Sequence, residues 1–251
     1  MKYLGVCYIA TGKYFRYFDT FKKEIEKFCP DTEKLVVVFT DKKETSNLIQ
    51  TFKKGVKFFF INIENLPWPM VTMFKFRRIQ QTKQLIEGLG FNCSHIVNLD
   101  ATVIPNREVQ PDEFLFEGKI GVIQHFLWNQ ISEQERADSF WVDYDKSIAW
   151  RDSRKIKWQA FPGFLSCPFN LVDGMCNEIG DMIAYDLKNY VIPYYHDESY
   201  YNKYLDNHPE LVQLVEDQVW EDDDKEWCQY NSNAMWRVLG YDSLQEEKWN
   251  K

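Results

Sequence analysis

Four consecutive polar residues, His196, Asp197, Glu198 and Ser199, lie between aromatic residues and are the clearest candidates for chemistry in the chain. Pro193 fixes its own φ and favours an extended residue before it, so we expect a strand-to-helix corner here. Asp197 and Glu198 would then lie in the first turn of a helix, where the dipole favours carboxylates and free amides can be capped. The alternative is a sugar-handling site, in which rings stack on a pyranose and a carboxylate acts on the anomeric carbon.

The run from His196 to Tyr204 reads His-Asp-Glu-Ser-Tyr-Tyr-Asn-Lys-Tyr and resembles the signature of glycosyltransferase family 6. That family includes the blood-group A and B transferases, the α-1,3-galactosyltransferase, and shorter bacterial members, to which this chain is most similar. The segment 8–14 resembles the opening of the bacterial members, and 38–41 looks like the end of their second strand. The resemblance covers roughly residues 2–215 with gaps, and 129–146 is its weakest part.

The resemblance implies an α/β fold of the GT-A type, with a Rossmann-like nucleotide-binding mixed sheet flanked by helices. Residues 1–251 would form one catalytic domain, in which 1–105 mainly bind the donor and 106–251 mainly bind the acceptor and carry catalysis. The implied activity is retaining transfer of GalNAc or Gal from a UDP-sugar to O3 of a galactose-containing oligosaccharide, in α-1,3 linkage. Glu198 would face the anomeric carbon as nucleophile or electrostatic stabiliser, and Asp197 would orient donor hydroxyls.

The resemblance also implies binding roles for aromatic and apolar side chains. Ile9 and Tyr14 would pack around the uracil of the donor, although Tyr14 taken on its own is better explained as a core ring. Tyr195 and His196 would hold the acceptor sugar. His125 corresponds to an acceptor-contacting histidine of the family within a shifted local pattern.

The stretch from Phe161 to Ser166 occupies the position of the family's donor-specificity loop, because Phe161 precedes Glu198 by 37 residues, as the first loop residue does in the family. Phe161 and Gly163 would therefore choose between galactose and N-acetylgalactosamine. A glycine leaves room for an acetamido group, so we expect a GalNAc donor. The bulk of Phe161 argues against this expectation. The alternative interpretation is that Pro162 and Gly163 simply form a turn.

The apolar stretch from His95 ends in Asn98-Leu99-Asp100, and strand alternation places Asn98 and Asp100 on one face. A carboxylate at such a strand end can hold a divalent ion that bridges a diphosphate, or the two residues can open a turn. In the family, mammalian members carry Asp-x-Asp and need manganese, whereas bacterial members carry Asn-x-Asn and work without metal. This chain has one residue of each kind, so we favour metal independence and keep Mn²⁺ at Asp100 as the alternative.

Lys75 lies on an expected helix from Val71 to Glu87, beside Arg77 and Arg78. It precedes Asn98 by 23 residues, the offset of a donor-contacting arginine in the family. Lysine loses bidentate hydrogen bonding but keeps a point charge for phosphate, so Lys75 would help to stabilise the leaving diphosphate. The alternative is an ordinary solvated basic face.

The elements that would position these residues are strands and helices in alternation. Apolar runs predict strands, and apolar spacing of three to four residues predicts helices; the strands are expected at 2–10, 34–40, 57–63, 95–100 and 119–124, and the helices at 15–28, 71–87 and 170–189. Ligands of such sheets lie at the carboxyl ends of the strands. The chain has neither GxGxxG nor a Walker loop, which excludes the usual dinucleotide enzymes and P-loop NTPases.

Composition narrows the class further. A formal net charge of −8 and a pI near 5.2 argue against a nucleic-acid partner, which would need a basic stripe. No apolar run approaches the ~20 residues of a transmembrane helix, and the N-terminal run is more typical of a first strand than of a signal peptide. The six cysteines show no zinc-type spacing, so we expect reduced thiols in a cytoplasmic protein.

Two other functions stay open on these residues. One is a carbohydrate- or nucleotide-binding protein that keeps the GT-A fold with weak or no turnover; the other is a GT-A enzyme of another family. The single carboxylate of the Asn98 and Asp100 pair favours the binding protein, as does the acidic run 221–224, where the family has a basic tail.

Overall fold

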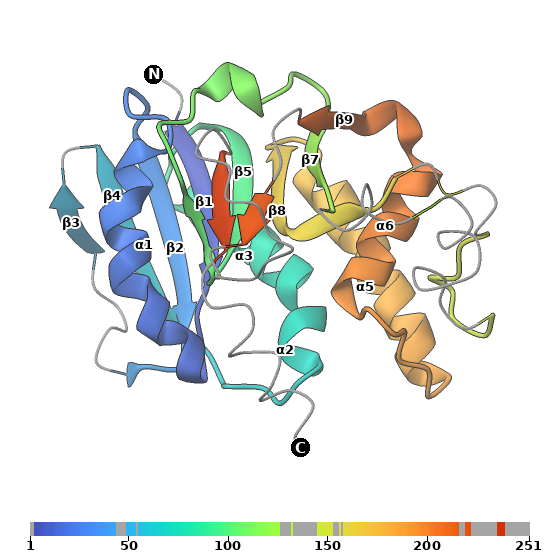
Figure 1. The fold of residues 1–251 in the computed structure, drawn as a ribbon. Helices are drawn as coiled ribbons and strands as arrows, with labels where there is room; N and C mark the ends of the chain where they lie inside the picture. The colour runs from blue at the N-terminus through green and yellow to red at the C-terminus, as the bar shows by residue number, and fades with distance from the viewer. Residues whose placement is uncertain are drawn as a thin grey trace.

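The computed structural model describes residues 3–43, 49–53, 55–125, 132, 145–152, 156, 158–215, 219–221 and 235–238. Within them, a mixed sheet with the order β3-β4-β2-β1-β5-β8-β7-β9 runs through the molecule (Figure 1). Its strands are β1 (Tyr3–Ile9), β2 (Lys34–Thr40), β3 (Ile49–Lys53), β4 (Val56–Asn62), β5 (Cys93–Asp100), β7 (Ile120–Gln124), β8 (Ala160–Pro168) and β9 (Val212–Val215). A small second sheet joins β6 (Val103–Pro105), β10 (Val219–Glu221) and β11 (Trp236–Val238).

The helices connect and cover the strands. The α-helices are α1 (Phe18–Glu24), α2 (Met70–Met73), α3 (Lys75–Gly88), α5 (Val172–Lys188) and α6 (Asp197–Asn207), and the short 3-10 helices are η1 (Gly12–Tyr17), η2 (Ile25–Lys27), η4 (Pro111–Glu113) and η7 (Pro209–Leu211). Strands β4, β2, β1 and β5 are parallel, whereas β8 pairs antiparallel with both β5 and β7. This mixed α/β sheet flanked by helices is the predicted fold class, and it is consistent with a GT-A-like glycosyltransferase fold.

Alternation along the central strands sends side chains into two separate cores. On β1, Val6 and Tyr8 pack on the face covered by α1, whereas Cys7 packs on the face covered by α3, α5 and α6. The two faces of β1 and β2 are therefore both buried, which explains why these strands read as continuous apolar runs. Gly5 permits the close approach of α3, since a Cβ there would lie 2.4 Å from Ile96 Cδ1 and 2.9 Å from Ile86 Cδ1.

Two predicted elements differ from those observed. The helix expected over 71–87 is divided at Phe74, which ends α2 and precedes α3. The predicted strand-to-helix corner before His196 is wrong, because residues 191–193 lie in a loop between α5 and α6 and pair with no strand. Extended local preference at Ile192 does not make a strand when no neighbouring strand is there to pair with it.

Five of the six cysteines lie in the described part of the chain, and each is a buried free thiol; Cys228 lies outside it. Burial raises the pKa of the Cys7 thiol to about 12, so this thiol is held in its protonated form. None of the described helices combines the length and apolar character required to cross a bilayer.

Candidate active site

The candidate site lies where β1 and β5 end together. Ile9 pairs with Asp100 at the carboxyl ends of these parallel strands, the edge at which α/β sheets bind ligands. Asn98 Nδ2 donates a hydrogen bond to Asp100 Oδ1 at 3.3 Å, as expected for two side chains on one face of the strand. Asn98 is completely buried and its Oδ1 has no hydrogen-bond partner, whereas the Asp100 side chain is 36% exposed. Asp100 is thus the member of the pair that meets solvent.

Lys75 joins three elements of the site through its ammonium group. Its Nζ lies 2.9 Å from Asp100 Oδ1 and 2.6 Å from Asp197 Oδ2, and it donates to the carbonyl of Pro162 at 3.2 Å. Burial opposes the charge of Lys75, but the two carboxylates outweigh burial and raise its pKa. A lysine in the first turn of α3 also works against the helix dipole, so the carboxylates fix its position.

Asp197 and Glu198 occupy the first turn of α6, as predicted, but neither caps it. The cap residue is His196, which makes no side-chain capping hydrogen bond and adopts φ 50° and ψ −115°. A non-glycine residue with this φ is strained, and such residues concentrate at functional sites. Asp197 instead reaches Lys75, and Glu198 reaches Gln159, so both carboxylates point into the site.

Glu198 is partly buried against the end of β8. Its Oε1 accepts a hydrogen bond from Gln159 Nε2 at 2.5 Å. Burial raises the pKa of this carboxyl to about 8, with Asp197 adding to the rise and Gln159 and Lys75 opposing it. A glutamate that titrates near neutral pH beside a second carboxylate is the kind of group that enzymes use as an acid, base or nucleophile.

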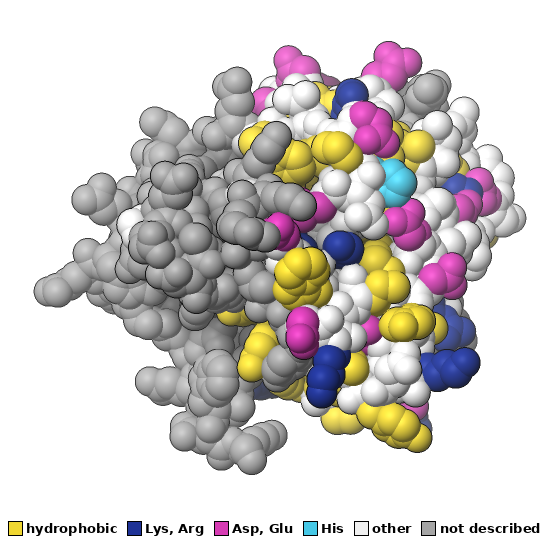
Figure 2. Space-filling model, turned by 90° about the vertical axis from the view of Figure 1, so that its right-hand side faces the viewer, with side chains coloured by type: hydrophobic (Ala, Val, Ile, Leu, Met, Phe, Trp, Pro, Cys, Tyr) yellow, Lys and Arg dark blue, Asp and Glu magenta, His cyan; other side chains and the backbone are white. Residues whose placement is uncertain are grey.

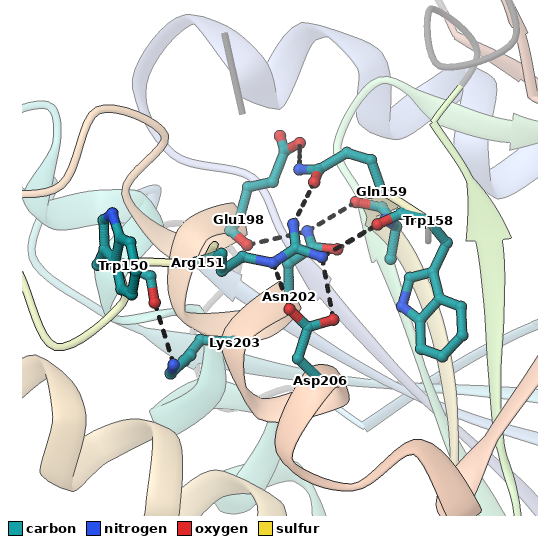
Figure 3. A network of polar contacts seen from close by, with 9 residues as sticks. Trp150, Arg151, Trp158, Gln159, Glu198, Asn202, Lys203 and Asp206 are labelled. Carbon is teal, nitrogen blue, oxygen red and sulfur yellow. Dashed lines mark hydrogen bonds and ion pairs between the residues drawn. The ribbon is translucent and has the colours of Figure 1, made fainter. Parts of the chain in front are cut away.

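A network of polar contacts behind Glu198 was not predicted from the sequence (Figure 3). Arg151 donates to Gln159 Oε1 at 2.6 Å and forms a bidentate ion pair with Asp206. Asn202, one residue of the family-like signature, donates to the carbonyl of Ala160 at 3.1 Å and accepts from its amide at 2.8 Å. These contacts hold α6 against the first residue of β8 and the residue before it.

The predicted donor-specificity loop is wrong as a loop, and so is the alternative turn, because Phe161, Pro162 and Gly163 lie within β8. Pro162 fits there because the register between β7 and β8 shifts at this point and β5 pairing ends at Phe164, so no ladder hydrogen bond needs its missing N–H. The expected room beside Gly163 is filled, since a Cβ on it would lie 2.4 Å from the Phe161 ring.

The remaining predicted residues are placed around this centre. The His125 ring lies 5.9 Å from the Phe161 ring, and burial lowers the pKa of His125 to about 3. Ile9 and Tyr14 contribute to opposite cores, Ile9 on the α3 face and Tyr14 on the α1 face. The structure therefore does not place these two side chains against each other.

The predicted acceptor residues lie at the start of α6. The Tyr195 amide donates to Ser199 Oγ at 3.2 Å, and the His196 ring meets Trp68 edge to face with 4.1 Å between centroids. Trp68 is 54% exposed. Trp68 was not among the predicted site residues, but its exposed ring beside His196 is suited to contact a sugar.

The donor set does not fit a divalent cation. Both oxygens of Asp100 engage Lys75, at 2.9 and 3.0 Å, so an ammonium already provides the positive charge that a metal would supply. Asn98 adds only a neutral amide, and within the described ranges no three His, Cys, Asp or Glu residues group so as to hold an ion. Hard divalent cations prefer several carboxylate or carbonyl oxygens together.

On the side of the molecule formed by α5 and α6, hydrophobic side chains stand in separate groups among charged ones (Figure 2). The exposed apolar residues there include Tyr185, Tyr190, Ile192 and Tyr194, which come from the end of α5 and the loop before α6. Tyr190 is 98% exposed. Scattered apolar side chains are ordinary on a protein surface, so we assign no function to this face.

Comparison with known proteins supports the class of enzyme. No protein-family model matches this chain. The O-antigen biosynthesis glycosyltransferase WbnI of Escherichia coli is 29% identical over 253 residues, which cover 98% of this chain and 97% of WbnI. The similarity extends over nearly the full length of both proteins. It supports a glycosyltransferase.

Proposed function

We propose that this protein is a metal-independent, retaining glycosyltransferase that moves N-acetylgalactosamine or galactose from a UDP-sugar to O3 of a galactoside, in α-1,3 linkage. The observation that carries the proposal is that Lys75 joins Asp100, at the carboxyl end of β5, to Asp197, which precedes Glu198 on α6. The family-6 resemblance of the run beginning at His196 supplies the donor, the linkage and the stereochemistry. The role of WbnI in O-antigen biosynthesis favours a growing glycan as acceptor.

In this reaction the bond between C1 of the sugar and the β-phosphate oxygen breaks, and its electron pair leaves with UDP. A new bond forms between C1 and O3 of the acceptor, and the O3 proton leaves with the UDP phosphate. Ionised Glu198 faces C1, either as the nucleophile of a glycosyl-enzyme or as the charge that stabilises an oxocarbenium-like transition state. Asp197 orients donor hydroxyls, and Lys75 turns toward the leaving diphosphate.

The donor choice rests on Phe161 and Gly163. Since the Phe161 ring covers the space over Gly163, an acetamido group would need this ring to rotate away. We keep GalNAc as the first donor to test and galactose as the second, and we assign Tyr195, His196 and Trp68 to the acceptor.

Release of UDP tests the proposal. The protein is incubated with a panel of UDP-sugars, with and without simple galactosides, in the presence and absence of excess chelator. We expect release from UDP-GalNAc or UDP-Gal that persists with chelator. Glu198→Gln should lower kcat at least ~100-fold with little change in UDP affinity, while Glu117→Gln, which changes an exposed glutamate, serves as the matched control.

One rival function has a specific observation in its favour. Both oxygens of Asp100 and one of Asp197 surround Lys75, so in this structure the ammonium faces carboxylates and not an open phosphate site. A binding protein without turnover would fit that arrangement. Binding of a UDP-sugar without release of UDP would establish this rival, and a strict manganese requirement would contradict metal independence.

A further inference from the structure

The guanidinium of Arg151 is almost fully buried and has a partner on each of its nitrogens (Figure 3). Nε and Nη2 bind the two carboxylate oxygens of Asp206 at 2.6 and 3.0 Å. Nη2 also donates to the carbonyl of Trp158 at 3.0 Å, and Nη1 donates to Gln159 Oε1 at 2.6 Å. Asp206 neutralises the charge and holds the planar fork, so the direction of the Nη1 hydrogen bond is fixed.

That hydrogen bond determines which way the Gln159 carboxamide faces. A guanidinium only donates, so the Gln159 oxygen must point toward Arg151 and its NH₂ must point the opposite way. Nε2 then donates to Glu198 Oε1 at 2.5 Å. If the carboxamide were rotated by 180°, its NH₂ group would face the N–H of Arg151 Nη1, and two donors would then meet without an acceptor. Arg151 therefore makes Gln159 a donor to Glu198.

The backbone around Gln159 is fixed as well. Its carbonyl accepts a hydrogen bond from the His125 amide at 2.6 Å, and Asn202 pairs with both backbone groups of the next residue, Ala160. Gln159 is 2% exposed. On the other side of Arg151, Lys203 of α6 donates to the carbonyl of Trp150 at 3.0 Å. Trp150 and Ala160, which lie on either side of Arg151 and Gln159 in the sequence, are thus both tied to α6.

We infer that Arg151 is a positioning residue, which acts through Gln159 to aim the Glu198 carboxyl and to favour its ionised form. This inference rests on the proposed function for its catalytic meaning, because Glu198 must be ionised to serve as nucleophile or stabiliser. The charged groups that act on Glu198 are Asp197, Lys75 and Arg151. Of these, Asp197 opposes ionisation of Glu198, whereas Lys75 and Arg151 favour it. The hydrogen bond that Gln159 donates also favours the ionised form of Glu198.

The test is a titration of Glu198 by ¹³C NMR on protein with labelled glutamate carboxyls, with its resonance assigned from Glu198→Gln. In Gln159→Leu and in Arg151→Leu the midpoint should rise by about one pH unit, which is the size expected for loss of one hydrogen bond to a charged group. In the double variant the two rises should not add, because Arg151 acts through Gln159. An unchanged midpoint, or fully additive rises, would overturn the inference.

Arg107→Leu is the matched control, since it breaks a surface bidentate pair with Glu113 and should leave the Glu198 midpoint unchanged. If Arg151→Leu fails to fold, Arg151→Lys replaces it, because lysine keeps the charge but cannot serve Asp206 and Gln159 as a planar fork. The Lys variant should also show a rise, smaller than that of the Leu variant because the positive charge is kept, and an unchanged midpoint in it would contradict the inference.

Activity provides a second readout that separates positioning from general stability. Gln159→Leu should move the acid limb of the UDP-release profile to higher pH, and it should have no further effect in a Glu198→Gln background. Full additivity in that background would assign Gln159 a merely structural role. If the wild-type protein releases no UDP from any donor, the proposed function fails, but the NMR midpoints still decide whether Arg151 acts on Glu198.

Discussion

Replacing Glu198 with glutamine should lower kcat at least ~100-fold and stabilise the protein at alkaline pH. The pKa of Glu198 is raised from its ordinary 4.5 to about 8 by burial, so the folded state holds a proton that the unfolded state releases. A raised carboxyl pKa means that stability is lost as pH rises from the unfolded value toward the folded one. Glutamine resembles the protonated acid in shape, and its oxygen can still accept the hydrogen bond from Gln159.

The size of the stabilisation follows from the pH range between the unfolded and the folded pKa of Glu198. Each pH unit between about 4.5 and 8 lowers the stability of the wild-type protein by about 1.4 kcal/mol. The interval from pH 5 to pH 8 contributes somewhat less than its full width, because the unfolded carboxyl still holds some of its protons at pH 5 and the folded carboxyl has lost some of its protons at pH 8. Relative to wild type, the free energy of unfolding of Glu198→Gln should therefore rise by about 3 kcal/mol between these two pH values. In a domain of this size the corresponding gain in Tm is roughly 6–12 °C.

Urea unfolding at pH 5, 6.5 and 8 measures this difference, with Glu117→Gln as the exposed control. Any constant cost of the amide substitution cancels, because only the change with pH is compared. A Glu198→Gln advantage that stays the same from pH 5 to pH 8 would refute the reasoning, and would show that the carboxyl is ionised in the folded protein at neutral pH.

The other predictions concern the charged centre, α6 and the thiols. Lys75→Met should lower UDP release at least ~100-fold, measured by a coupled UDP assay, because no ammonium then faces the diphosphate. Asp100→Asn should tighten UDP binding in calorimetry, and Asp197→Asn should tighten it less. Asn202→Leu should lower the free energy of unfolding by about 3 kcal/mol, since it leaves buried backbone groups of β8 without partners. Cys228→Ser should react with a thiol reagent only on unfolding, because the five remaining cysteines are buried.

Sequence periodicity predicted the elements that build the site. The continuous apolar runs at 34–40 and 95–100 have both faces buried, so their strands appear at nearly the predicted bounds. Alternation correctly placed Asn98 and Asp100 on one face, and the position of Asp197 and Glu198 in a first turn is confirmed. These predictions depend only on local patterns, which tertiary packing here reinforces.

The parts that sequence did not predict depend on contacts between distant segments. Gln159 and Arg151 lie in a stretch without apolar periodicity, and each acquires its role only when α6 packs against β8. Phe161 and Gly163 were expected in a loop from the family resemblance, or in a turn at Pro162 and Gly163, but a register shift lets them continue a strand. Lys75 was identified, yet its carboxylate partners come from β5 and α6, 25 and 122 residues away in sequence.

The unequal effects expected at Asp100 and Asp197 follow from how unequally they are buried. Lys75 and its two carboxylates carry a combined formal charge of −1, which would repel an incoming diphosphate unless one pairing is exchanged. The Asp100 side chain is 36% exposed, so water can solvate it once it is released, whereas Asp197 is 9% exposed and would be left as a buried unpaired charge. Replacing the Lys75–Asp100 ion pair with a contact between Lys75 and phosphate therefore costs less than replacing the Lys75–Asp197 ion pair. Lys75 then stays paired with Asp197, beside Glu198, while it turns toward phosphate.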